Sequence, residues 1–93
     1  MIELTVVSSN LEDEEHVIQS TTVDGFYFKF IDSNSAYTKK EAYTLKTEWG
    51  ARKEPFAIVK DKDKVLRCFY SEKNDRVIDD ALQFIKGLKE TYD

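Results

Sequence analysis

The chain has 93 residues and a formal net charge of −4, and 41% of its residues are hydrophobic and 34% charged. This length suits a single domain over residues 1–93, and the apolar content argues against disorder. The acidic balance disfavours a nucleic-acid partner, since affinity for phosphate comes mostly from clustered Lys and Arg, and no run of about 18 apolar residues predicts a membrane span.

The chain begins with a strand pattern followed by a helix pattern. Residues 2–7 first alternate between apolar and polar side chains, then become fully apolar, and are rich in β-branched residues, which predicts a strand that enters a sheet interior. Residues 11–20 predict a short helix, because good N-cap residues precede it and acidic side chains fill its first turn, where the helix dipole favours them. Leu11 and Ile18 are the expected apolar anchors of this helix.

An aromatic strand and a second helix are expected next. Residues 26–31 hold four aromatic side chains in an apolar run and predict a strand with both faces covered. Thr38 and Glu41 match the capping box, and apolar residues then recur at helical spacing until Gly50, which suits a left-handed C-cap. This pattern predicts a helix over residues 39–49.

The next segment predicts a hairpin. Pro55 lacks an amide donor and is tolerated at the first residue of a strand, so it suits the start of a strand over residues 56–59. A polar turn over residues 60–64 leads to the expected partner strand over residues 65–70.

The final helix has the clearest periodicity. Asn74 or Asp75 is its expected N-cap. Its apolar residues repeat at i, i+3, i+4, i+7 and i+10, and they are Ile78, Ala81, Leu82, Ile85 and Leu88. The predicted element order is therefore β-α-β-α-β-β-α, without an internal repeat.

This order and one segment resemble the thioredoxin and glutaredoxin-like fold family. Residues Trp49 to Pro55, Trp-Gly-Ala-Arg-Lys-Glu-Pro, followed by an apolar strand, are similar to the thioredoxin stretch Tyr-Gly-x-Arg-x-x-Pro. Residues 28–32 look like the second core strand of the family, and residues 74–88 like its last helix. The chain size and the stretch Phe-Tyr-Ser-Glu at residues 69–72 also resemble small thioredoxin-like proteins of tailed bacteriophages.

The resemblance implies an α/β fold with a mixed four-stranded sheet, helices on both faces and a cis Glu54-Pro55 bond. It also shows what is missing, because the family places two cysteines, two residues apart, after the first strand. The matching residues here are Ser8, Ser9, Asn10 and Leu11, and a serine hydroxyl is not a thiolate at neutral pH. We therefore expect neither dithiol oxidoreductase activity nor a cofactor.

The single cysteine, Cys68, has two readings. It could be a redox or glutathione-linked site, or a small buried side chain that shares a strand face with Leu66 and Tyr70. The buried reading is favoured, because free cysteines are usually buried. One cysteine, together with an N-terminus unlike a signal peptide, suits a cytoplasmic protein.

No metal site is expected. His16 has no second histidine to complete a zinc site, and the acidic run over residues 12–15 lacks the Asp, Asn and Gly pattern of a calcium loop. A solvated histidine and a charged first helical turn are the simpler readings.

The resemblance implies a groove beside Pro55 in which the residue before a cis proline pairs with an extended peptide. Its expected lining residues are Ser8, Ser9, Asn10, Trp49, Lys53, Glu54 and Pro55. The leading hypothesis is a non-catalytic module that binds a protein or peptide there. One alternative is a redox or glutathione-linked protein that uses Cys68. The other is an accessory subunit of a larger, viral assembly whose hairpin edge, residues 65–70, pairs with a neighbour. The partner's identity and the oligomeric state stay open.

Overall fold

The protein, described here as a computed structural model of residues 1–73 and 75–92, has its helices and strands in the predicted order. The strands are β1 (Ile2–Ser8), β2 (Tyr27–Asp32), β3 (Phe56–Asp61) and β4 (Lys64–Tyr70). The helices are α1 (Leu11–Asp24), α2 (Lys39–Trp49) and α3 (Val77–Tyr92). The α/β class is confirmed.

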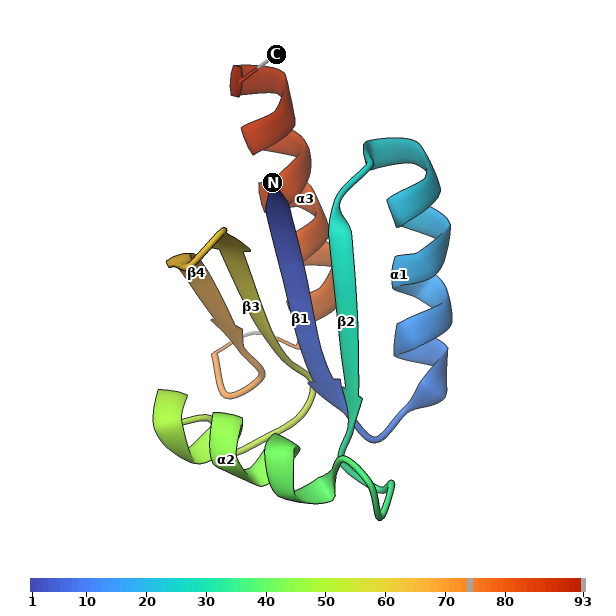
Figure 1. The fold of residues 1–93 in the computed structure, drawn as a ribbon, viewed down its shortest axis with the longest axis vertical. Coiled ribbons are helices and arrows are strands. Elements are labelled where there is room, and N and C mark those ends of the chain that lie inside the picture. The colour runs from blue at the N-terminus through green and yellow to red at the C-terminus, as the bar shows by residue number, and fades with distance from the viewer. Residues whose placement is uncertain (74, 93) are drawn as a thin grey trace.

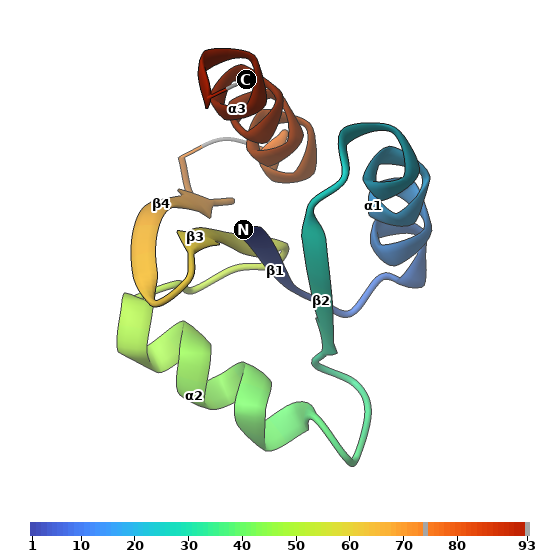
Figure 2. The ribbon, with the colours of Figure 1, turned by 45° about the horizontal axis from the view of Figure 1, so that its top comes forward.

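The strands form one mixed sheet in the order β2-β1-β3-β4 (Figure 1). β1 is parallel to β2 and antiparallel to β3, which is antiparallel to β4. Helices α1 and α3 lie on one face of this sheet and α2 on the other, as Figure 2 shows. The central strands β1 and β3 are covered on both faces, so nearly all of β1 and the apolar first four residues of β3 are buried.

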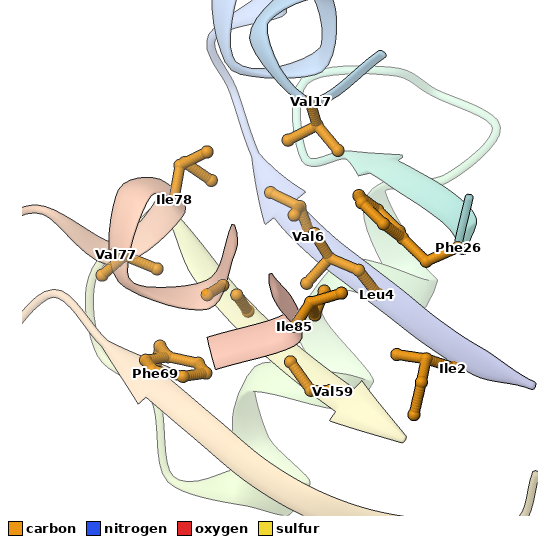
Figure 3. Close-up of a cluster of buried hydrophobic side chains, with 12 residues drawn as sticks. Ile2, Leu4, Val6, Val17, Phe26, Val59, Phe69, Val77, Ile78 and Ile85 are labelled. Carbon is orange, nitrogen blue, oxygen red and sulfur yellow. The ribbon is translucent and has the colours of Figure 1, made fainter. Parts of the chain in front are cut away.

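Each face of the sheet has its own hydrophobic cluster, because alternate residues of a strand point to opposite faces. The cluster under α1 and α3 is shown in Figure 3 and includes Ile2, Leu4, Val6, Val17, Phe26, Ala57, Val59, Phe69, Val77, Ile78, Ala81 and Ile85. The cluster under α2 includes Val7, Ile31, Ala42, Ala51, Phe56 and Ile58. These two clusters hold the three layers together.

Helix α1 packs on the sheet through Val17, which is fully buried. The predicted anchors were wrong, since Leu11 is 61% exposed and Ile18 is 50% exposed. Leu11 and Ile18 do share one side of the helix, but that side faces solvent. Two apolar positions cannot tell which side of a helix faces the sheet, and the tertiary packing decides it.

Strand β2 lies at an edge of the sheet and is only partly covered. Phe28 and Phe30 pack against the cluster under α1 and α3. Tyr27, however, is 62% exposed, so the prediction that both faces are covered was wrong at this residue. Tyr27 and Ile31 lie on the same face of β2, and only Ile31 is covered there by other side chains.

Helix α2 has the predicted limits, but its capping box was predicted wrongly. The hydroxyl of Thr38 donates to the Asp32 carbonyl at 2.6 Å and does not cap the helix. Glu41 instead accepts from Lys29 at 2.7 Å. The left-handed C-cap at Gly50 is confirmed, with φ of 72°.

The hairpin turn is shorter than predicted, because β3 and β4 extend to Asp61 and Lys64. The pairing is irregular after Val59, so Leu66 is an extra residue in β4. This bulge shifts the alternation: Leu66 packs with the cluster under α1 and α3, whereas Cys68 packs with the cluster under α2. The prediction that Leu66 and Cys68 share a face was therefore wrong.

Helix α3 has the predicted apolar face: Ile78, Ala81 and Ile85 are buried, and the remaining two predicted residues pack against them. The Arg76 carbonyl accepts from the Asp80 amide at 2.9 Å, so the helix starts two residues after Asp75, and Asp75 is not its cap. Asn74, the other predicted cap, lies outside the described residues. Across residues 1–73 and 75–92, no helix combines the length and the hydropathy that crossing a bilayer requires.

Candidate functional site

The predicted site residues gather mostly at one end of the sheet, where β1 and β2 end and β3 begins. Ser8 pairs with Asp32 in the parallel ladder, and the neighbouring Val7 pairs with Phe56 of β3. Pro55 directly precedes β3, and the Glu54-Pro55 bond is cis, as expected. The loop after Ser8 and the residues before β3 thus lie at the same sheet end.

The side chains of Ser8 and Asn10 form hydrogen bonds that stabilise the start of helix α1. The Ser8 hydroxyl donates to the Asp13 carboxylate at 2.7 Å and accepts from the Asn10 amide at 3.0 Å, and Ser8 is only 2% exposed. The Asn10 side chain accepts from the Glu12 amide at 3.0 Å, which is the bond of an N-cap. Ser9, between them, is exposed, and its side chain makes no hydrogen bond within the part of the chain that the structure describes.

The Glu54 side chain is held from two sides. Lys46 of α2 lies 2.8 Å from one carboxylate oxygen, and Ser33 donates to the other at 2.5 Å. Partial burial would raise the pKa of Glu54, but the hydrogen bonds from Lys46 and Ser33 and the charge of Lys46 outweigh it, so the pKa is lowered. The carboxylate is therefore ionised and fixed at neutral pH.

Ser33 also links the two halves of the predicted site. Its amide donates to the Ser8 carbonyl at 3.1 Å, while its hydroxyl contacts Glu54. A single turn residue after β2 thus connects the end of β1 to the residue before Pro55. On the other side, Ser71 donates to the Pro55 carbonyl at 2.7 Å.

Lys53 contributes its backbone to a different contact. The Glu72 carboxylate, in the turn after β4, accepts from the amides of Arg52 and Lys53. Its own backbone amide is the largest cause of a lowered pKa at Glu72, with the amides of Arg52 and Lys53 adding to it. The Lys53 side chain remains exposed.

Trp49 lies apart from Ser8 and Glu54. It packs against the cluster under α2, and its carbonyl accepts from the Tyr70 hydroxyl at 2.8 Å. Together with Arg52 and Lys73 it lines a cavity of about 390 Å³. None of the predicted residues Ser8, Ser9, Asn10 and Glu54 lines this cavity.

Cys68 sits in β4, paired with Ile58, and is partly buried against the cluster under α2. Burial raises the pKa of its thiol, and a hydrogen bond with Tyr70 offsets this only in part. A raised pKa leaves less thiolate, the reactive form, at neutral pH.

His16, for which the sequence predicts a solvated side chain, contacts a second helix. Its Nε2 lies 3.0 Å from Asp79 of α3, and both side chains are half exposed. Over residues 1–73 and 75–92, no three His, Cys, Asp or Glu side chains are grouped so that they could hold a metal ion.

Comparisons with protein-family models, curated proteins and solved structures found no match to this chain. Its function is therefore inferred from its own residues and fold.

Lys46, Ser33 and Glu72 are the contacts that sequence reasoning missed. Each meets its partner across 8 to 21 residues of chain. The spacing of residues along the chain does not predict such a contact, because the contact depends on how α2, β3 and β4 pack. Only the cap at Asn10 was visible locally, as a polar residue before a helix pattern.

Proposed function

We propose that the chain is a non-catalytic, thioredoxin-like module that binds an extended segment of a protein partner beside Pro55. The strand order, the helices on both faces and the position of Pro55 before a central strand support this assignment. The exposed Ser9 follows β1 at the same end of the sheet, and the exposed Lys53 lies just before Glu54 and Pro55 in the chain.

The observation that carries the proposal is the backbone of Glu54. Its side chain is bonded to Lys46 and Ser33, yet among residues 1–73 and 75–92 its amide and carbonyl make no hydrogen bond. Glu54 lies just before β3 and is only partly buried. A fixed residue with an unpaired amide and carbonyl is suited to pair with an extended chain, as in strand addition.

A non-catalytic role is supported by the loop after β1. Ser8 stands where the family has its first cysteine, and its hydroxyl is buried and bonded to Asp13. A substrate could not reach it without breaking the start of α1. A partner can still contact the side chains of Ser9 and Lys53 and the backbone of Glu54.

Site-specific crosslinking tests the proposal. A photo-activatable residue at Ser9 or Lys53 should capture the same partner, whereas one at Lys62, in the turn at the opposite end of the sheet, should not. Lys62 is a matched control because it is also exposed and its amide donates to the carbonyl of Met1, just before β1. Equal capture from all three positions would contradict the proposal.

The captured partner, once purified, permits a second measurement. Ser9→Arg should weaken binding about tenfold by steric block without changing the thermal midpoint, since the Ser9 side chain is exposed. Hydrogen exchange at the Glu54 amide should slow in the complex. Unchanged exchange there would show that the partner binds elsewhere.

The two alternatives receive less support. The raised pKa of Cys68 disfavours the redox or glutathione-linked reading. A Cys68→Ser variant that lost a glutathione-dependent activity would restore it. The accessory-subunit hypothesis requires a neighbour that pairs with the edge of β4. The side chains at that edge favour a partner of more specific chemistry.

A further inference from the structure

A second candidate surface lies between the outer edge of β4 and helix α3, away from Pro55. A cavity of about 620 Å³ opens there. Its lining includes Arg67, Phe69, Lys73, Asp80, Gln83 and Phe84. In Figures 1 and 2, β4 is the last strand on its side of the sheet, and α3 lies over the face next to it.

Arg67 is the central feature of this surface. Its guanidinium carbon lies 5.0 Å from the centre of the Phe69 ring and 5.6 Å from that of Phe84. The two rings are themselves in edge-to-face contact at 5.9 Å. The two rings hold the guanidinium in place, but within residues 1–73 and 75–92 Arg67 has no hydrogen-bond or ion-pair partner, so its N–H donors are unpaired.

The backbone beside Arg67 is also available. Residues 67–70 pair regularly with β3 on their inner side, and no described strand pairs with their outer side. The bulge at Leu66 and the charge of Lys64 interrupt the first part of the edge, which protects it from unspecific pairing. An extended chain can therefore add to β4 along residues 67–70.

We propose that this edge binds an extended segment of a partner protein that places an Asp or Glu side chain against Arg67. Charge complementarity identifies the occupant, because Arg67 and Lys73 outnumber the one lining carboxylate, Asp80. A carboxylate can accept two parallel N–H bonds from the planar guanidinium. The backbone of the segment pairs with β4, and the side chain two residues along, which points to the same face, packs against Phe84.

A second copy of this chain fits the edge less well. Symmetric pairing of two β4 strands would bring Lys64, Arg67 and Lys73 of both copies to one seam, and like charges across strands are destabilising. This surface does not include Glu54 or Pro55. This inference can therefore hold if the function proposed above is wrong, and that function can hold if this inference is wrong.

Displayed libraries of random heptapeptides with a fixed central Glu, Gln or Lys provide the test. The wild type should recover binders from the Glu library about tenfold more often than from the Gln library, and least often from the Lys library. Arg67→Gln, which retains an aliphatic stem, should lose this preference, and Arg67→Glu should shift recovery to the Lys library.

Lys40→Glu is the matched control, because it makes the same change in charge at an exposed position on α2, on the other face of the sheet. It should keep the wild-type preference. Equal recovery from the three libraries, including no recovery from any, overturns the proposal, as does a Glu preference that survives in Arg67→Glu. Thermal unfolding of each variant checks that it is folded.

Hydrogen exchange and molecular mass test the mode of binding. A Glu-library peptide should slow amide exchange within residues 67–70 and leave α2 unchanged. Protection confined to α3 would overturn strand addition. A concentration-dependent dimer that Arg67→Glu abolishes would identify a second copy as the occupant and also overturn the proposal.

Discussion

Lys46 and Glu54 form an ion pair of 2.8 Å that joins the last turn of α2 to the residue before Pro55. Their side chains are only 22% and 20% exposed, unlike those of the Lys29 and Glu41 pair, which are 51% and 45% exposed. Water and salt weaken an exposed pair more than a covered one. The covered pair therefore contributes more to positioning the loop before β3.

Glu54→Gln should lower the free energy of unfolding by about 1 to 2 kcal/mol, because it leaves the partly buried Lys46 ammonium without its counter-charge. Glu41→Gln, at the exposed pair, should change it by less than about 0.5 kcal/mol. Urea unfolding at neutral pH measures both. Equal losses of unfolding free energy in the two variants would show that burial does not make one ion pair more stabilising than the other.

The contribution of Glu54 should depend on pH. Folding lowers its pKa, so the stabilisation is complete above the ordinary value of 4.5 and is lost as the pH falls through the lowered value. The difference in unfolding free energy between wild type and Glu54→Gln should therefore shrink between about pH 7 and pH 3. A difference that stays constant over this range would contradict the lowered pKa.

Loss of the Asn10 cap should destabilise α1. Asn10→Ala removes the acceptor of the Glu12 amide and should cost about 1 kcal/mol in unfolding free energy. Asn10→Asp keeps an acceptor and should retain most of the stability. Ser9→Ala, at the exposed neighbour, is the control and should cost less than about 0.5 kcal/mol.

Cys68 should react slowly in the folded protein. Because burial raises the pKa of its thiol, the thiolate fraction at neutral pH is below that of an unhindered cysteine. Labelling by a disulfide reagent at about pH 7 should be at least about tenfold faster in concentrated urea than in buffer. Similar rates in both solutions would indicate an accessible, reactive thiol.

Substitutions at two adjacent residues of α1 should differ sharply in their effect on the free energy of unfolding. Val17→Ala removes a fully buried side chain and should cost about 2 kcal/mol. Ile18→Ala changes a side chain that is 50% exposed and should cost less than about 0.5 kcal/mol. Comparable losses in thermal or urea unfolding would mean that α1 packs with a different side toward the sheet.

The sequence was most informative where one local pattern was strong. The apolar spacing of α3 has enough members to indicate both the helix and its buried side, and Gly50 marks the end of α2 by a conformation that other residues rarely adopt. It was weak where the pattern had few members, as in α1, where the predicted anchors Leu11 and Ile18 gave the wrong side. At the site, the contacts between residues close in sequence are those at the start of α1, whereas the contacts of Glu54 and Glu72 come from other elements.

By itself, the sequence determined the order of the strands and helices, the burial of β1 and the absence of a paired dithiol, because periodicity and residue type are local properties. Tertiary structure alone decided that Lys46 and Ser33 would fix Glu54, that the bulge at Leu66 would separate it from Cys68, and that Arg67 would lie against Phe84 of α3. These contacts join residues on different elements, so they follow from packing geometry rather than from spacing along the chain.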